Sequence, residues 1–257
     1  RISGPFQWMV PFKGYSAVNT VALYAQRHFH DFGTTRETLG EIATNNRRNA
    51  ALNPKAVFTE PLNMGDYLEA RMISSPLCLF DCDVPVDAST AIVVSRAEAA
   101  KEVSDPIYLE ALGSALHGQD SWDNFSPDLT EMAAHDAAAV MWSQTDLTPA
   151  DVETAQLYDG FSMLTLSWIE ALGFCGKGEA KDFLMGGGNI SRDGLLPLNT
   201  NGGQLSGGRT HGFGYFYEAI LQMRGEAGER QLAHQPRVAV VANGGGPLGS
   251  CFLLRTD

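Results

Sequence analysis

The sequence predicts a layered α/β fold. Helical spacing of apolar residues alternates along the chain with short apolar stretches that are typical of buried strands. Glycine-rich stretches follow several of these strands, as they do where a ligand site lies at strand ends. With 257 residues, 44% of them hydrophobic, the chain can bury a substantial core in one large domain or in two closely packed ones.

The first part of the chain is predicted to be helical. Apolar residues recur at helical spacing over 18–31, and Gly33 ends the pattern. A second helix is expected to begin at Thr34, because Glu37 follows three residues later as in a capping box. This helix should end before the Asn-Pro pair at 53–54, since the residue before a proline disfavours helical geometry.

The pattern changes twice before the middle of the chain. LNMGDYLEARMIS (62–74) indicates a short third helix. ASTAIVVSR (88–96) is small, β-branched and apolar, which predicts a strand buried on both faces. The next stretch, AEAAKEVSD (97–105), is charged and alanine-rich. We therefore predict a domain boundary there, with one domain at 1–105 and a second at 106–257.

The second half alternates strands and helices. Strands are expected at 107–116, in the residues that lead to Tyr158, at 237–243 and at 249–254. Helices are expected at 129–142, 161–172 and 215–224, and 117–128 is expected to be irregular. The alternation favours a ligand site at the strand ends.

The composition argues against several classes of function. A net charge of −12 disfavours nucleic acid as a partner. No run of about 18 apolar residues is present, and the first residues lack a secretory signal, so a soluble, cytoplasmic protein is expected. The four cysteines lack zinc-site spacing, which favours buried free thiols and no metal site. The chain starts with what looks like a mid-domain loop, so a further segment is expected upstream.

Three loops carry the candidate chemistry. They are YDGFS (158–162), NTNGGQLSGGRTHGFG (199–214) and ANGGGPLG (242–249). Glycines let backbone N–H groups approach a ligand, so such loops suit anions and oxyanions, although each alone is more often a turn. The glycine spacing does not match a dinucleotide-binding loop, and no serine-hydrolase elbow is present.

Single residues in these loops leave alternatives open. Tyr158 and Asp159 are, without further context, more often a core tyrosine and a helix N-cap. His211 is by itself more often a turn residue. Arg209 lies among glycines, and a long cation there predicts either a carboxylate partner or an anionic ligand.

Longer motifs resemble a known family. The stretch NTNGGQLSGGRTHGFGYFYEAILQMRGEAGERQ (199–231) resembles the glycine-rich loop and helix end of sterol-carrier-protein-type thiolases. YDGFSMLTLSWIEALGFCGKGEA, NNRRNAALNPKAVF, SPLCLFDCDVPVDASTAIVVS and ANGGGPLG also resemble thiolase segments, and the match covers nearly the whole chain. The resemblance implies two similar halves, each a mixed five-stranded sheet, stacked as αβαβα layers and forming a homodimer. The amino-terminal half is then incomplete in this chain.

The departures from the thiolase pattern change the expected chemistry. Arg209 stands where thiolases have the histidine of the Gly-His-Pro loop, and Tyr158 replaces the asparagine or histidine of the strand-end motif. Ala242 stands where the last loop has its cysteine or histidine acid. Arginine cannot accept a proton from a thiol at neutral pH, and alanine cannot donate one. Ordinary acyl transfer is therefore disfavoured.

The pattern that remains is similar to thiolase-like aldolases and lipid-transfer proteins of steroid side-chain breakdown. These cleave a β-hydroxyacyl-CoA by a retro-aldol reaction into a shorter acyl-CoA and a ketone or aldehyde. The resemblance makes Tyr158 the base, with its pKa lowered by Arg209, and His211 or Tyr215 the group that reprotonates the enolate. It implies an oxyanion hole at Asn243, Gly244 and Gly245, with Gly208 in the facing wall.

The resemblance also implies partners. Coenzyme A enters as part of the substrate and no cofactor is covalently bound. A small partner subunit of zinc-ribbon and OB-fold type is expected. Arg47 and Arg48 are candidates for the CoA phosphates, or else form a solvated basic helix face. Two other functions stay open: an acyltransferase with an upstream nucleophilic cysteine, and a non-catalytic subunit that binds acyl-CoA or lipid.

Overall fold

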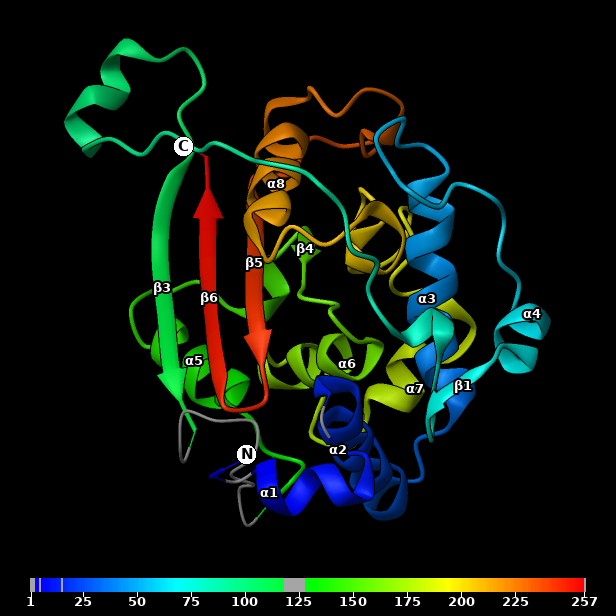
Figure 1. Ribbon diagram of the computed structural model, residues 1–257. Helices are drawn as coiled ribbons and strands as arrows, with labels where there is room; N and C mark the ends of the chain where they lie inside the picture. The colour runs from blue at the N-terminus through cyan, green and yellow to red at the C-terminus, as the bar shows by residue number, and fades with distance from the viewer. Residues whose placement is uncertain (1–2, 5, 15, 118–127, 257) are drawn as a thin grey trace.

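The main sheet of the molecule is four-stranded and mixed (Figure 1). The computed structural model describes residues 3–4, 6–14, 16–117 and 128–256. The sheet has the order β3-β6-β5-β4. Its strands are β3 (Tyr108–Leu116), β4 (Thr154–Gln156), β5 (Val238–Gly245) and β6 (Leu248–Arg255). β3 and β5 pair antiparallel with β6, whereas β4 and β5 run parallel.

The observed sheets differ from the five-stranded sheets that the resemblance implies. The described residues place four strands in the main sheet. A separate two-stranded ladder joins β1 (Met72–Ser74) to β2 (Leu77–Cys78). The fold class is nevertheless α/β, because helices cover both faces of a mixed sheet.

Alternate residues of β5 divide the core between the two faces. Val240 and Ala242 pack toward α5 (Ala133–Trp142) and α6 (Ser162–Ala171). Ala239 and Val241 pack toward α8 (Phe213–Arg224), whose Tyr215, Ala219 and Met223 complete the second cluster. The sheet is therefore a middle layer, with α8 on the opposite face from α5 and α6.

The helix α3 (Arg36–Ala50) is buried although its sequence is polar. Its asparagines supply hydrogen bonds to a loop of the second half: Asn45 Nδ2 and Asn49 Nδ2 both donate to the carbonyl of Leu198, at 3.1 and 2.8 Å. The first 105 residues thus pack closely against the rest, and the predicted boundary at 105 stays a prediction.

The remaining elements are short or lie at the edges of the fold. The α-helices are α1 (Phe6–Met9), α2 (Ala17–Phe32), α4 (Met64–Glu69) and α7 (Ala180–Leu184). The 3-10 turns are η1 (Val10–Phe12), η2 (Leu79–Asp81), η3 (Ala97–Glu102), η4 (Pro149–Asp151), η5 (Met185–Gly187) and η7 (Gly228–Arg230), and η6 (Gly203–Gly207) is a π-turn. No helix in the described ranges is long and apolar enough to cross a membrane.

The predicted start of the second helix is wrong by one residue. The N-cap is Thr35, and Thr38 rather than Glu37 closes the capping box. The reason is that Thr34 is engaged elsewhere, since its hydroxyl lies 2.8 Å from His28 Nδ1. The helix predicted at 129–142 begins only at Ala133. Residues 118–127, most of the segment expected to be irregular, lie outside the described residues.

The buried strand predicted at 88–96 is also wrong. This segment contains no strand, and Val93 and Val94 are 95% and 83% exposed. β-Branched composition favours extended backbone, but a strand also needs a neighbour to pair with, and none in the described part of the chain pairs here. In Figure 1 the segment passes α8 and leads to η3, which projects from the body of the molecule.

Candidate active site

The strand-end motif, the glycine loop and the end of β5 converge. β4 and β5 are parallel neighbours, so Tyr158, just after β4, and Asn243, near the end of β5, lie at the same edge. His211 connects them from the loop at 199–214. Its carbonyl accepts a hydrogen bond from Asn243 Nδ2 at 3.3 Å, and its ring lies parallel to that of Tyr158, with centroids 6.5 Å apart.

Asp159 holds this edge of the sheet together through its buried carboxylate. It is fully buried and accepts hydrogen bonds from Asn46 Nδ2 at 2.6 Å and Gln204 N at 2.7 Å, and also from Leu205 N and the Tyr215 hydroxyl. Burial raises the pKa of Asp159 to about 6. It is not the N-cap of α6, which is Phe161.

Tyr215 is held in the same network. Its hydroxyl donates to Asp159 Oδ1 and accepts from the Asp159 N–H at 3.0 Å. Burial and the neighbouring carboxylate raise the pKa of Tyr215 well above its ordinary value. Its predicted role in enolate reprotonation stays a prediction, whereas its contacts position the turn that carries Tyr158.

The phenol of Tyr158 is harder to ionise than the sequence suggested. Burial, together with Asp83 and Asp159, raises its pKa to about 12. Arg209 does lower this pKa, as expected, and so does Gln204, but burial outweighs both. Tyr158 is therefore protonated at neutral pH, and the expectation of a phenolate produced by Arg209 needs correction.

Asp83 is the carboxylate that faces Arg209. Arg209 Nη1 lies 3.6 Å from Asp83 Oδ1, with side chains 41% and 11% exposed. The pKa of Asp83 is about 6, because burial raises it more than Arg209 lowers it. Sequence reasoning left open a carboxylate partner for Arg209 but did not find this one, which lies more than a hundred residues earlier in the chain. The signal available was its place in the DCD stretch of a thiolase-like segment.

The backbone around Asp83 lies between the other two motifs. Asp83 N–H donates to the carbonyl of Gly160 at 3.2 Å, and Val84 N–H donates to the carbonyl of Gln204 at 3.2 Å. Arg209 N–H donates in turn to the carbonyl of Val84 at 2.8 Å. Residues 83–84 thus fix the distance between the turn after β4 and the glycine loop.

Gln204 is a second residue that the sequence did not reveal. Its side chain is 1% exposed, and Oε1 accepts the His211 N–H at 3.0 Å. Its Nε2 is buried without a hydrogen-bond partner among the described residues. The amide lies near enough to the Tyr158 hydroxyl to lower its pKa. An unpaired buried donor is costly, so this one is suited to an oxygen of a bound ligand.

The predicted oxyanion hole is closed by a local hydrogen bond. Gly244 N–H donates to Asn243 Oδ1 at 2.9 Å, and the Gly244 carbonyl accepts from Trp168 Nε1 at 2.9 Å. A Cβ at Gly245 would lie 2.9 Å from Leu164, so this glycine packs on α6. The oxyanion role of these residues stays a prediction, and a substrate oxygen must displace the Asn243 amide to reach Gly244 N–H.

Gly208 packs against the segment that follows Asp83. Its φ is +120°, and a Cβ there would lie 2.6 Å from Val86 Cγ1. Glycine is thus required on both steric and backbone grounds. This contact keeps residues 83–86 against the glycine loop.

The two candidate CoA-binding arginines point to different surroundings. Arg47 is buried, donates to Ser206 Oγ at 2.9 Å and to the carbonyl of Glu60 at 3.2 Å, and lies 5.0 Å from the ring centroid of Phe58. It therefore does not belong to a solvated basic face, but supports the glycine loop. Arg48 is exposed on another side of α3. CoA binding by this pair stays a prediction.

The thiols of the described residues do not form a reactive site. All four cysteines are free. Burial raises the pKa of Cys78, and it raises those of Cys82, Cys175 and Cys251 to about 12. A nucleophilic cysteine needs a lowered pKa. Nor does any group of three or more His, Cys, Asp or Glu side chains in the described ranges form a candidate metal site.

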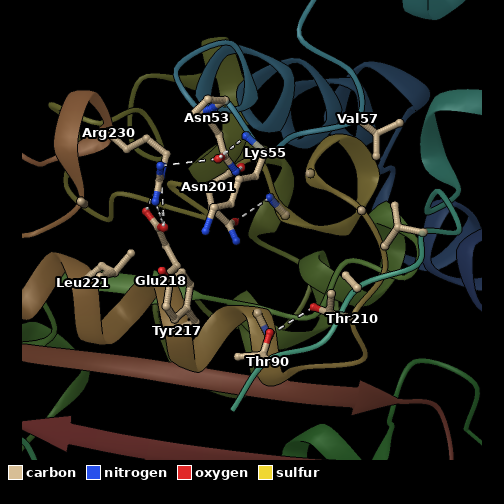
Figure 2. A pocket seen from close by; sticks show the side chains of 18 of the residues that line it. Asn53, Lys55, Val57, Thr90, Asn201, Thr210, Tyr217, Glu218, Leu221 and Arg230 are labelled. Carbon is tan, nitrogen blue, oxygen red and sulfur yellow. Dashed lines mark hydrogen bonds and ion pairs between the residues drawn. The ribbon is translucent and has the colours of Figure 1, made fainter. Parts of the chain in front are cut away.

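A cavity of about 860 Å³ lies along the glycine loop (Figure 2). Gly208 and Thr210 line it, whereas Arg209, His211 and Tyr158 do not. Figure 2 shows Glu218 and Arg230 side by side on one wall, where they form an ion pair of 2.9 Å. This wall therefore carries compensated charge, and the candidate catalytic groups lie outside the cavity lining.

Two known proteins are similar to this chain in sequence. The chain is 38% identical over 238 residues to a 17-hydroxy-3-oxo-4-pregnene-20-carboxyl-CoA lyase of Mycobacterium tuberculosis, covering 91% of this chain and 61% of the relative. It is 35% identical over 258 residues to a steroid side-chain-cleaving aldolase of Thermomonospora curvata, covering 98% and 65%. The chain thus spans less than two thirds of the length of these relatives.

Solved structures and a family model agree on the fold. A structure described as the Ltp2-ChsH2(DUF35) aldolase matches with a TM-score of 0.89 and 31% identity, covering 98% of this chain and 66% of that one. The model of the thiolase C-terminal domain-like family matches residues 118–254. Since this match covers more than half of the sequence, the chain belongs to the thiolase C-terminal domain-like family, within the thiolase superfamily.

Proposed function

We propose that this chain is part of an enzyme that cleaves a carbon–carbon bond of an acyl-CoA thioester. The substrate would be a β-hydroxyacyl-CoA with a steroid or lipid side chain. The retro-aldol reaction would release a shorter acyl-CoA and a ketone or aldehyde. Both curated relatives described above are named for this class of cleavage, as a CoA lyase and as a side-chain-cleaving aldolase.

The observation that carries this proposal is the replacement of the acyl-transfer groups. Arg209, at the position of the thiolase histidine, pairs with Asp83 rather than with a thiol. Ala242, at the position of the acid, is buried and cannot transfer a proton. The thiols have raised pKa values. Tyr158, Arg209, His211 and Gln204 lie near one another instead, and their side chains have the hydrogen-bonding groups and positive charge that suit a hydroxyl group and an enolate.

The side chains would divide the work as follows. The Tyr158 hydroxyl and Gln204 Nε2 would hydrogen-bond the β-oxygen of the substrate, beside the positive charge of Arg209. Tyr158 would be the residue through which the β-hydroxyl loses its proton. Gly244 N–H and Asn243 would then hold the thioester oxygen as the enolate forms. His211, which is exposed, would return a proton to the enolate carbon.

The proposal includes partners. A structurally similar protein is described as an assembly of Ltp2 with ChsH2(DUF35). A partner subunit of zinc-ribbon and OB-fold type is therefore proposed here, together with a homodimer. Coenzyme A is proposed as part of the substrate, and a cytoplasmic location stays a prediction.

The experiment is cleavage of a β-hydroxyacyl-CoA that carries a bulky ring substituent. The full-length protein with its partner subunit is expected to release a ring ketone and a shorter acyl-CoA, detected by mass spectrometry. Tyr158→Phe should lower kcat by about 100-fold or more, the range of general acid–base groups. Tyr108→Phe, at the start of β3 and at the opposite end of the sheet from Asn243, is the matched control and should retain activity.

Two outcomes would contradict the proposal. Thiolysis of a β-ketoacyl-CoA by added CoA, without retro-aldol cleavage, would show an acyltransferase. Unchanged kcat in Tyr158→Phe would remove Tyr158 from the reaction.

A further inference from the structure

Three buried or nearly buried aspartates lie within this part of the fold, and one differs from the other two. Asp81 accepts hydrogen bonds from the Tyr67 hydroxyl at 2.7 Å, from Cys78 N at 2.7 Å and from Ser162 Oγ. Asp159 accepts four, as described above. These two carboxylates are saturated with donors and fully buried. Both therefore serve as structural anchors.

Among the described residues, no comparable set of donors faces the Asp83 carboxylate. The charged group that faces its carboxylate is Arg209, at 3.6 Å, a distance longer than a direct charge-assisted hydrogen bond. Its side chain retains 11% exposure, and that of Arg209 retains 41%. The ion pair is therefore reachable from solvent, and at least one carboxylate oxygen can take a proton from an incoming group.

The position of Asp83 relative to the proposed reaction centre is fixed by the backbone. Its N–H group is bonded to Gly160, two residues after Tyr158. A Cβ at Gly160 would lie 2.8 Å from the Tyr158 hydroxyl, so the phenol folds back over the residue to which Asp83 is bonded. Asp83, Tyr158 and Arg209 consequently form one cluster built from three separate segments.

Resting on the function proposed above, we infer that Asp83 is the final acceptor of the proton that leaves the β-hydroxyl group. The O–H bond breaks as its proton moves to the Asp83 carboxylate, directly or through the Tyr158 hydroxyl. The oxygen electrons form the new C=O bond, the Cα–Cβ bond breaks, and its electron pair becomes the thioester enolate. Protonation of Cα then completes the shorter acyl-CoA. One proton is taken and one returned, so no oxidant, reductant or water is consumed.

The ionisation of the cluster agrees with this assignment. A group with a pKa of about 6 is ionised at neutral pH and is still basic enough to accept a proton. Tyr158, with a pKa of about 12, is not a phenolate at neutral pH and so cannot itself be the base that keeps the proton. Tyr158 can only pass a proton on, and Asp83 is the ionised group beside it.

The test uses the full-length protein with its partner subunit and the β-hydroxyacyl-CoA above. Asp83→Asn should lower kcat/KM at pH 8 by at least 100-fold. In the unsubstituted protein, kcat/KM should fall tenfold per pH unit below about pH 6, and this limb should be absent in Asp83→Asn. Arg209→Gln should move the limb to higher pH, because Arg209 lowers the pKa of Asp83.

Two further variants separate chemistry from structure. Asp105→Asn removes an exposed carboxylate outside the cavity lining and should leave both rate and pH profile unchanged. Asp83→Glu keeps a carboxylate and should recover part of the rate together with an acid limb. Circular dichroism should show that all variants are folded.

The outcomes distinguish this inference from the proposed function. If the unsubstituted protein cleaves the substrate and Asp83→Asn keeps its rate and its acid limb, the inference is overturned and the proposed function stands. If the unsubstituted protein does not cleave the substrate at all, both are overturned. Loss of rate in Asp83→Asn with an unchanged acid limb would assign that limb to another group and would also overturn the inference.

Discussion

At the scale of single residues, the site depends on groups whose ordinary ionisation has been changed by burial. Asp83 and Asp159 both have a pKa of about 6, and Tyr158 has one of about 12. In each case burial is the largest cause. Groups with perturbed pKa values are often found at functional sites, and Asp83, Asp159 and Tyr158 all lie around the turn after β4. Each pKa shift contributes to the free energy of unfolding, and a substitution of the group measures that contribution.

Asp83 should make the protein less stable as pH rises. Its pKa is raised in the folded state, from an ordinary 3.8 to about 6. Its contribution to stability is therefore fully present below the ordinary pKa and is lost as pH rises through 6. Two pKa units correspond to about 3 kcal/mol. Between pH 4 and pH 8, the free energy of unfolding of the unsubstituted protein should thus fall by up to about 3 kcal/mol more than that of Asp83→Asn. Urea denaturation of both proteins at the two pH values measures this difference. An equal pH dependence in both proteins would contradict the burial argument.

The side-chain amide of Gln204 lowers the pKa of Tyr158, so substitutions of Gln204 should change the ionisation of Tyr158. Gln204→Glu keeps the acceptor for His211 N–H but removes the donor, so the pKa of Tyr158 should rise further. Titration of a fluorotyrosine incorporated at position 158 measures this directly. Loss of the hydrogen bond that Nε2 would donate to the substrate oxygen is worth about 1 to 1.5 kcal/mol, so kcat/KM should fall roughly tenfold. Gln204→Leu loses both the acceptor for His211 N–H and the amide donor, so its kcat/KM should be lower still. If the pKa of Tyr158 does not change in either variant, Gln204 does not influence this pKa.

Sequence reasoning found the residues that belong to ordered motifs and missed those that do not. Tyr158, Arg209, His211 and Asn243 lie in glycine-rich loops, and the structure brings these loops together. Asp83 reaches the site through backbone pairing with a loop far along the chain, which no local spacing signals. Gln204 is likewise an ordinary residue whose importance comes from its burial. The alternative of a solvated basic face is wrong for Arg47, because its cation is satisfied by buried partners rather than by water, whereas CoA binding stays a prediction.

At the scale of elements, the close approach of β3 to α5 depends on one glycine. A Cβ at Gly113 would lie 1.8 Å from the carbonyl oxygen of Ala137, and backbone cannot move aside as a flexible side chain can. The strand and helix periodicities were predictable because their patterns are local. The strand expected at 88–96 was not formed, because pairing depends on a neighbour that a local pattern does not specify.

Gly113→Ala should therefore be strongly destabilising. We expect a loss of more than about 3 kcal/mol of unfolding free energy, the range of overpacking with backbone shift, or failure to fold. Gly188→Ala is the matched control, since nothing lies within 4 Å of its Cβ position and its φ is ordinary. It should change stability by less than about 0.5 kcal/mol. Thermal unfolding of both variants compares them, and equal effects would mean that β3 and α5 are farther apart than described.

At the scale of the whole molecule, the first part of the chain completes the second. Asn46 on α3 donates to Asp159, a contact across 113 positions of sequence. Asn45 and Asn49 donate to the carbonyls of Leu198 and Asn199. A polar helix can be central to a fold in this way, because its amides replace water for the carbonyls of Leu198 and Asn199, beside the parallel bridge that pairs Leu198 with Ala155 of β4.

A fragment of residues 106–257 is therefore not expected to fold by itself. It would leave the Asp159 carboxylate and the carbonyls of Leu198 and Asn199 without their α3 donors, and would expose the apolar surface that Leu39 and Ile42 cover. Circular dichroism and amide dispersion in an NMR spectrum would show this. Addition of the fragment 1–105 should restore folded signals. A cooperatively folded 106–257 fragment would instead establish the predicted boundary as an independent domain.

The segment at 83–84 has a consequence for motion as well as for geometry. The amides of Val84 and Arg209 form the two hydrogen bonds that join this segment to the glycine loop, and both bonds must break together if that loop opens. Amide hydrogen exchange at Val84 and Arg209 should therefore occur at a common rate, as one opening unit, whereas the Asp83 amide, bonded to the strand-end turn, can exchange separately.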